Sequence, residues 1–310
     1  MSEAEPGELD DARSGPAWAG RDPVDDSAAR LSCLIYRTRN LGDMIQTLAL
    51  SRLLSRMTGV YRHALDEAPA RRGFGVNGFL EGDAPPREGP VPLFAGVSGP
   101  YWRREAYLSW LRRSPWSIGA RDPVTWERLG AEGIRSEMIG CATLTLPRYD
   151  GPRSGIYSVD CDGPGTRMTH VISRNLSLAG QWAQAREFLE KYRKAEAVHT
   201  SRLHVALPCL AFGTPVWVAR PHGAAFPERF SLIDALGCSW EKLTVKDVSA
   251  VATAYREFLG RHLGLCIRPG EPVCPIPVRT NGLRWTERIR FAVRDKKWEW
   301  TARWRGVRPC

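Results

Sequence analysis

The chain has 310 residues, 43% of them hydrophobic, and a formal net charge of +10 at pH 7, so it is long enough for two domains or one large one. It contains no run of about 18 apolar residues, which argues against a transmembrane helix. The N-terminus also lacks the basic start and apolar stretch of a secretory signal, so a cytoplasmic location is expected.

The positive charge comes from 38 Arg and 6 Lys that are spread along the chain rather than gathered in one stripe. No zinc-finger, RNP-type or GXXG pattern accompanies them, so no nucleic-acid partner is expected. An anionic substrate accounts for a basic surface equally well. The eight cysteines form no CxxC pair, and His, Asp and Glu do not group at metal-ligand spacing. We therefore expect free thiols and chemistry without a metal or other cofactor.

The two ends of the chain differ from its middle. Residues 1–30 carry eight acidic and three basic side chains with little periodic apolar content, which predicts a disordered acidic tail. Residues 271–310 form a basic extension with a net charge of +6 and four tryptophans. Three interpretations of this extension stay open: a helix packed on the first domain, a helix docked on the inner membrane face or a protein partner, and nucleic-acid contact.

From residue 31 onward the chain reads as strand–turn–helix units. A strand at residues 34–36 leads through the turn Asn40-Leu41-Gly42-Asp43 into a helix. Its apolar residues lie on or near one face: Ile45, Leu48, Ala49, Leu53, Leu54 and Met57. Asn40 or Asp43 can cap this helix, and Gly42 permits close approach of a neighbouring backbone. Capping alone explains the turn, and so does presentation of Asn40 and Asp43 to a ligand.

Composition and turn residues predict the remaining elements. Predicted strands are 75–79, 92–97, 117–120, 135–139, 156–160, 169–172, 197–199 and 216–218. Predicted helices are 101–113, the segment after Asp122, 182–192, 203–210 and 245–263. A polar segment at 151–155 is the predicted boundary between two α/β halves, residues 31–150 and 151–270.

The most informative turn is Thr200-Ser201-Arg202-Leu203-His204, which joins a short strand to a helix that ends at Gly213. Thr200 or Ser201 is expected to cap the helix. In an open α/β sheet, such a turn lies at the carboxyl end of a strand, where ligands bind, and the free N–H groups of the helix favour an anion. The planar guanidinium of Arg202 can bind two oxygens of a phosphate or carboxylate, and His204 can exchange a proton near neutral pH. An anion clamp and an ordinary strand–helix connection are both compatible with these residues.

Five short motifs resemble, in the right order, the sequence blocks of the polysaccharide pyruvyl transferase family. They are Asn40–Ala49, Val76–Phe79 with Pro92–Phe94, Ile118–Asp122 with Thr125, Gly140–Leu146, and Thr200–His204 with Pro208 and Gly213–Val216. Any one of them is weak, but five in order over residues 31–235 are specific.

The resemblance implies an α/β, GT-B-like fold in which two Rossmann-like domains face a cleft, with residues 31–150 on the acceptor side and 151–270 on the donor side. It also implies phosphoenolpyruvate as donor, a sugar or polysaccharide diol as acceptor, and a cyclic pyruvate ketal as product. Arg202, Leu203, His204 and Arg121 would bind the donor or act in catalysis.

Chemistry adds roles to these residues. Phosphoenolpyruvate carries a phosphate and a carboxylate, which Arg202, Arg121 and the helix start at Ser201 can bind. We expect His204 to protonate the methylene carbon and Asp43 to accept the proton of the acceptor hydroxyl, although a capping role for Asp43 is equally compatible. Asn40 and Gly42 are expected on the substrate side of the facing half. The alternatives are a GT-B glycosyltransferase that uses a nucleotide sugar, and a non-catalytic relative that binds a partner through residues 271–310.

Overall fold

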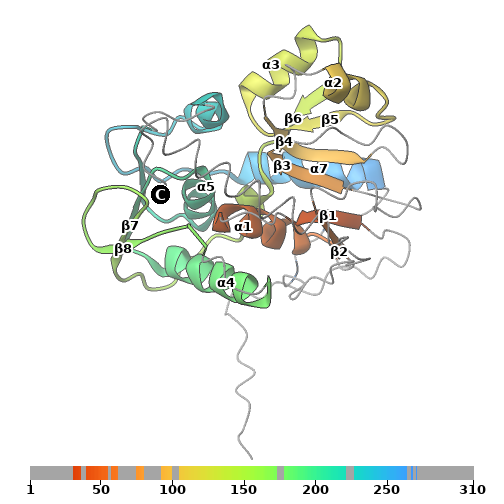
Figure 1. The fold of residues 1–310 in the computed structure, drawn as a ribbon. Helices are drawn as coiled ribbons and strands as arrows, with labels where there is room; N and C mark the ends of the chain where they lie inside the picture. The colour runs from red at the N-terminus through yellow and green to blue at the C-terminus, as the bar shows by residue number, and fades with distance from the viewer. Residues whose placement is uncertain are drawn as a thin grey trace, which may run out of the picture.

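The computed structural model describes residues 31–35, 40–54, 57–61, 75–79, 92–99, 105–172, 178–220, 227–263, 267 and 270. The predicted acidic tail and the basic C-terminal extension lie outside these residues. Within them, helices lie between many of the successive strands, and the strands form three sheets in which every pairing is parallel (Figure 1). The predicted α/β class is confirmed. None of the helices in this part of the chain is both long and apolar enough to cross a membrane.

The first half of the chain forms two of the sheets. Strands β1 (Leu31–Ile35) and β2 (Met57–Tyr61) pair with each other. The four-stranded sheet has the order β3 (Gly75–Phe79), β4 (Leu93–Ser98), β5 (Ile118–Ala120) and β6 (Ser136–Met138). Helices α2 (Glu105–Arg112) and α3 (Pro123–Ala131) connect its later strands. Strand β4 is buried along its whole length, as its uninterrupted apolar composition predicts.

The second four-stranded sheet has the order β10-β9-β7-β8. Its strands are β7 (Ile156–Val159), β8 (Thr166–Met168), β9 (Ala197–Thr200) and β10 (Val216–Val218). Helix α4 (Leu178–Lys194) precedes β9, and α5 (Leu203–Phe212) lies between β9 and β10. Gly213 ends α5 in the left-handed conformation, with φ 69°.

The prediction of a strand at residues 169–172 is wrong. The strand in this region is β8, which ends at Met168. The His170 N–H donates to the Asp160 carboxylate, and the Val171 N–H donates to the Thr169 hydroxyl. These two backbone donors therefore bond to side chains instead of a neighbouring strand. Val171 forms only an isolated antiparallel bridge to Asn40.

Helix α1 (Leu41–Ser51) lies at the centre of the molecule (Figure 1) and is buried on all sides. The prediction of a single apolar face is therefore too narrow: α4, α5 and the 3-10 helix η3 (Ala142–Thr145) pack against α1. The helix also ends earlier than predicted, since Leu53 and Leu54 follow it and Met57 belongs to β2.

The end of the described chain packs on its first half. After the short helices η4 (Pro227–Phe230) and α6 (Ser231–Ala235), α7 (Ser249–Leu263) crosses to β4 and η3. The Tyr255 hydroxyl donates to the Ala95 carbonyl at 3.0 Å, and an ion pair joins Arg261 to Glu137. A Cβ at Gly96 would lie 3.0 Å from the Tyr255 ring, so glycine permits this contact.

Arg153 joins the ends of two helices in the second half. Its Nη1 donates to the Arg193 carbonyl near the end of α4, at 2.8 Å, and to Thr214 Oγ1. Its Nη2 donates to the carbonyls of Tyr149 and of Phe212, the last residue of α5, at 2.8 and 2.7 Å. Carbonyls at helix ends have no partner within the helix, and a cation is favoured there. Arg153 thus fixes α4 and α5, whose positions determine where the site lies.

Candidate functional site

The starts of α1 and α5 meet. The Asn40 side-chain oxygen accepts a hydrogen bond from the Gly42 N–H at 3.1 Å, which confirms the predicted cap. The Leu41 N–H donates to the His170 carbonyl at 2.9 Å. A Cβ at Gly42 would lie only 2.9 Å from the Cβ of His204, so glycine permits the predicted close approach. Residues far apart in sequence are thereby brought to one place.

The turn before α5 is held to the neighbouring strand rather than capped as predicted. Thr200 Oγ1 accepts from the Arg202 N–H at 2.9 Å and donates to the Val159 carbonyl at 3.1 Å. Ser201 Oγ donates to the Asp160 carbonyl at 2.6 Å. The N-cap residue is Arg202, and no side chain in the described part of the chain caps the helix. The predicted cap by Thr200 or Ser201 is therefore wrong, and the positive end of the α5 dipole is not neutralised by a capping side chain.

His204 lies at a kink in α5, with φ −83° and ψ 15°. The cause is Pro208, four residues later, which has no N–H for the His204 carbonyl and whose ring crowds that carbonyl. The local sequence therefore separates the first turn of α5, which carries His204, from the remainder of the helix.

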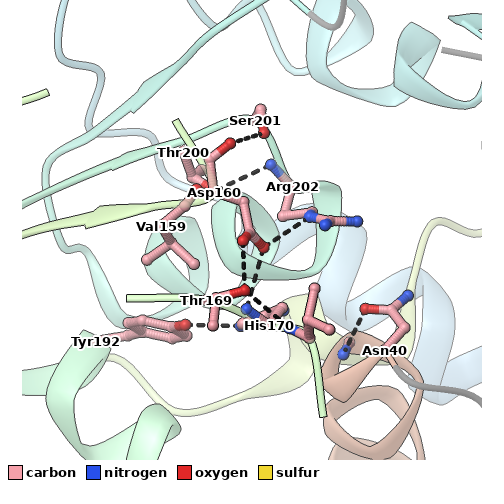
Figure 2. A network of polar contacts seen from close by, with 11 residues as sticks. Asn40, Val159, Asp160, Thr169, His170, Tyr192, Thr200, Ser201 and Arg202 are labelled. Carbon is pink, nitrogen blue, oxygen red and sulfur yellow. Dashed lines mark hydrogen bonds and ion pairs between the residues drawn. The ribbon is translucent and has the colours of Figure 1, made fainter. Parts of the chain in front are cut away.

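Asp160, at the end of β7, is the one non-glycine residue with positive φ in the described part of the chain, at 52°. Its carboxylate accepts hydrogen bonds from Thr169 Oγ1 at 2.6 Å, Arg202 Nε at 2.8 Å and the His170 N–H at 3.0 Å (Figure 2). Burial alone would raise the pKa of Asp160, but these hydrogen bonds and the Arg202 charge outweigh burial and hold the pKa below its ordinary value. Asp160 is thus a charged anchor for Arg202.

Asp160 fixes one edge of the Arg202 guanidinium and leaves the other available. The bond to Asp160 uses Nε, and Figure 2 shows the terminal nitrogens extending beyond the carboxylate. The Arg202 side chain is 29% exposed, so this outer edge can meet a ligand. A planar fork with a fixed Nε is well suited to bidentate binding of phosphate or carboxylate.

His170 lies buried beneath this network. Its Nε2 is 2.7 Å from the Tyr192 hydroxyl, and its ring packs against Phe188 and Tyr192. Burial lowers the pKa of His170 to about 3, so the ring is neutral near pH 7. His170 therefore supports the site as an uncharged, packed group.

His204 is also neutral near pH 7. Burial lowers its pKa well below the ordinary value, with further contributions from the charges of Arg121 and Arg229 and from His170. Its Nδ1 is 3.4 Å from Gln46 Nε2 of α1. Its Nε2 is buried and has no hydrogen-bond partner among the described residues. A buried nitrogen without a partner at a helix start can be satisfied by a ligand.

Arg121 follows β5 and is 1% exposed. Its backbone N–H donates to the Val97 carbonyl at 2.9 Å, and its Nε is 3.6 Å from Asp122 Oδ2. Asp122 caps α3 by accepting from the Thr125 N–H at 2.9 Å, so the helix begins after Asp122 as predicted. Arg121 Nη1 is buried without a hydrogen-bond partner in the described part of the chain. A buried guanidinium with an unsatisfied donor is costly, and an anion would satisfy it.

The structure therefore brings some of the predicted site residues together, but not all of them. Asn40, Gly42 and His204 meet at the two helix starts, and Ser201 and Arg202 bond to Asp160. Asp43 is buried and accepts a hydrogen bond from Gln46 at 3.5 Å. Leu203 is buried in the hydrophobic core. Substrate contacts by these residues stay predictions.

Sequence reasoning did not single out Asp160, His170 or Gln46. Asp160 carried a usable signal, because it is the last residue of a predicted strand whose carboxyl end lies beside that of the strand before Thr200. Gln46 was a polar residue within an apolar helix, which is a second usable signal.

These features define an α/β protein with donors for an anion where two helix starts meet. Residues 91–222 match the family model described as polysaccharide pyruvyl transferase, so the resemblance is confirmed over this segment, which includes Arg121, Arg202 and His204. No curated protein matches the chain. A solved structure of a functionally uncharacterised protein from Klebsiella pneumoniae is similar, with a TM-score of 0.44 and 11% sequence identity over 66% of this chain and 88% of that chain.

Proposed function

We propose that this protein is a pyruvyl transferase, which moves the enolpyruvyl group of phosphoenolpyruvate onto two hydroxyls of a sugar during polysaccharide or glycoconjugate biosynthesis. The observation that carries the proposal is a set of N–H donors inside the family-matched segment. Arg121 Nη1 and His204 Nε2 are buried without a hydrogen-bond partner among the described residues. Arg202 keeps a partly exposed outer edge beyond its Nε bond to Asp160, and no side chain of the described residues caps the start of α5. Their charge and geometry suit a ligand with both a phosphate and a carboxylate.

Donor binding relies on charge-assisted hydrogen bonds. Arg202 is held in place by Asp160 and binds one anionic group through its terminal nitrogens. Arg121 and the N–H groups of α5 bind the other. Each such bond contributes about 1.5–3 kcal/mol, so two or three of them account for selective binding of a small anion. The Ser201 hydroxyl keeps the turn in place through Asp160.

Ketal formation requires one proton at carbon and one at the leaving phosphate. The methylene carbon of the enolpyruvyl group takes a proton and becomes a methyl group, and an acceptor hydroxyl attacks the adjacent carbon. The bond from that carbon to the phosphate oxygen then breaks, inorganic phosphate leaves, and the second hydroxyl closes the ring. The two hydroxyl protons balance those taken up by carbon and phosphate.

We assign His204 as the acid for the methylene carbon. The negative charge of a bound donor opposes the effects of Arg121 and Arg229, so donor binding raises the pKa of His204 from its low value in the free protein. Asp43, on the acceptor side, is the proposed group for the acceptor proton.

A GT-B-like arrangement, with the donor and the acceptor bound by different halves, agrees with these proposed roles. We infer that residues 31–150 form the acceptor half and residues 151–270 the donor half. The contact between Gly42 of α1 and His204 of α5 supports this inference, because it joins the two proposed halves at the helix starts.

Calorimetric titration with phosphoenolpyruvate tests the proposal, with a nucleotide sugar and inorganic phosphate as comparison ligands. Wild-type protein should bind phosphoenolpyruvate selectively. Arg202→Ala should weaken that binding by about 10- to 100-fold, the loss of one or two charged contacts. The matched control is Arg167→Ala, since Arg167 on β8 forms an exposed ion pair with Asp162 in the described part of the chain and should not affect binding.

The other outcomes separate the alternatives. Unchanged affinity in Arg202→Ala would remove Arg202 from the donor site. Binding of the nucleotide sugar in place of phosphoenolpyruvate would favour a glycosyltransferase. Binding of neither ligand would favour a non-catalytic relative.

A further inference from the structure

Gln46 of α1 contacts three polar groups in the buried site. Its Nε2 is 3.4 Å from His204 Nδ1 and 3.5 Å from Asp43 Oδ1. Its Oε1 is 4.0 Å from Cys141 Sγ, and Thr143 Oγ1 donates to the same sulfur at 3.2 Å. Gln46 is 1% exposed, so these neighbours, rather than water, determine how its amide is oriented.

The neighbours favour one orientation of the amide. The Asp43 carboxylate accepts hydrogen bonds and repels an amide oxygen, so the NH₂ group belongs on the side of Asp43 and His204. On the opposite side, the Cys141 thiol donates to Oε1. Burial raises the pKa of Cys141, so the thiol keeps the proton that this bond needs. The amide nitrogen therefore faces His204 Nδ1 as a donor.

We infer that Gln46 is a positioning residue that holds neutral His204 in the tautomer with its single proton on Nε2. Nδ1 accepts from Gln46, so the proton must reside on the other ring nitrogen. That nitrogen is buried and has no partner among the described residues. The His204 N–H is thus directed to a ligand rather than to the protein.

This inference extends the proposed function, and its catalytic consequence rests on that function. In a pyruvyl transferase, this tautomer directs the Nε2–H of His204 at phosphoenolpyruvate, and the ring takes up its second proton, at Nδ1, when the bound donor raises the pKa of His204. Loss of the Gln46 amide allows the ring to adopt the other tautomer and to turn. We therefore expect Gln46→Met to lower kcat by about 100-fold, the scale of a misplaced catalytic group, with a nearly unchanged KM for phosphoenolpyruvate.

The tautomer itself can be measured without any substrate. Protein labelled with ¹⁵N at histidine should show a protonated Nε2 and an unprotonated Nδ1 for His204 in two-bond ¹H–¹⁵N correlation spectra near pH 7. His204→Asn identifies the signal. Gln46→Glu keeps the size of the side chain but replaces the donor with an acceptor, so it should move the proton to Nδ1 or produce the doubly protonated ring. The His170 signal is an internal control that should not change in either Gln46 variant.

Two results would overturn the inference: a proton on Nδ1 of His204 in the wild-type protein, or the wild-type tautomer in Gln46→Glu. The proposed function fails separately, because absence of phosphoenolpyruvate binding leaves the tautomer measurement unaffected. If the proton leaves its wild-type position in Gln46→Glu while Gln46→Met keeps a wild-type kcat, Gln46 fixes the tautomer but catalysis does not use it, and the catalytic consequence is overturned.

Discussion

The left-handed backbone at Asp160 is costly for any residue with a side chain, and least costly for Asn and Asp. Here the conformation brings one carboxylate to Thr169, His170 and Arg202 together. The strained backbone at the end of β7 thus places the carboxylate that fixes the Arg202 guanidinium at the start of α5. Strain of this kind is frequent at functional sites.

Asp160→Asn separates the charge of this residue from its backbone role. Asn tolerates positive φ and keeps a hydrogen-bonding side chain, but it loses the charge that holds Arg202. We expect phosphoenolpyruvate affinity to fall by about 10-fold, the loss of roughly one charged contact. Asp162→Asn is the matched control, because Asp162 is 95% exposed and, among the described residues, forms its ion pair with Arg167. Wild-type affinity in Asp160→Asn, measured by calorimetry, would limit Asp160 to a structural role.

His170 predicts a pH dependence of stability. In the unfolded chain it takes up a proton near pH 6.5, whereas in the folded protein it stays neutral down to about pH 3. Between these values the unfolded state binds more protons, so stability falls as the pH falls, by up to about 1.4 kcal/mol per pH unit for this one group. Above pH 6.5 this contribution does not change with pH.

His170→Gln removes the titrating group but keeps an amide that can bond to the Tyr192 hydroxyl. Urea unfolding at several values from about pH 4.5 to 6 should show a smaller pH slope for this variant than for the wild type. His199→Gln serves as control, because His199 lies half-buried beside Trp217 and its titration should affect the slope less. Equal slopes in wild type and His170→Gln would contradict the prediction.

At the scale of elements, the sequence predicts most strands and helices because their signals are local. Apolar runs identify β4, and Asp122 with Thr125 identifies the start of α3. The errors occur where contacts with groups distant in sequence determine the local structure. The carboxylate of Asp160 takes the His170 N–H that a strand would need, and α4 and α5 pack on α1, which is buried beyond its predicted apolar face. Neither partner is visible in the local pattern.

Gly42 tests how closely α1 and α5 must approach. Alanine normally stabilises a helix relative to glycine, by about 0.5–1 kcal/mol. At Gly42, however, the new Cβ would lie 2.9 Å from the His204 Cβ and 3.1 Å from its Nδ1. We expect Gly42→Ala to displace His204, lower turnover and cancel the gain in helix stability. Gly130→Ala in α3 is the matched control, because a Cβ there would meet no atom of the described residues within 4 Å.

The two variants together isolate the clash. Thermal unfolding should show Gly130→Ala to be more stable than the wild type and Gly42→Ala to be less stable than Gly130→Ala. Equal stabilisation by both, with unchanged turnover of phosphoenolpyruvate, would show that α1 and α5 do not need this close contact.

At the scale of the whole molecule, the two halves predicted from the sequence share one hydrophobic cluster. It includes Leu93 of β4, Leu144 of η3, Val198 of β9 and Phe258 of α7. The family-matched segment, residues 91–222, also runs across the predicted boundary at 151–155. The sequence predicts two α/β halves from repeated strand–helix units, but contacts such as Tyr255 with Ala95, 160 residues apart, leave no local pattern.

A shared core predicts that the halves unfold together. Urea unfolding followed by tryptophan fluorescence and by far-ultraviolet circular dichroism should give coincident single transitions.

Tyr255→Phe leaves the buried Ala95 carbonyl without its donor and should lower the free energy of unfolding by about 1–2 kcal/mol. Because α7 joins both halves, both probes should shift equally without a change in slope. Tyr149→Phe is the control, since the Tyr149 hydroxyl makes an exposed bond to the Pro152 carbonyl. If Tyr255→Phe shifted one probe and not the other, the halves would unfold independently, and the contact between the helix starts would form after each half had folded.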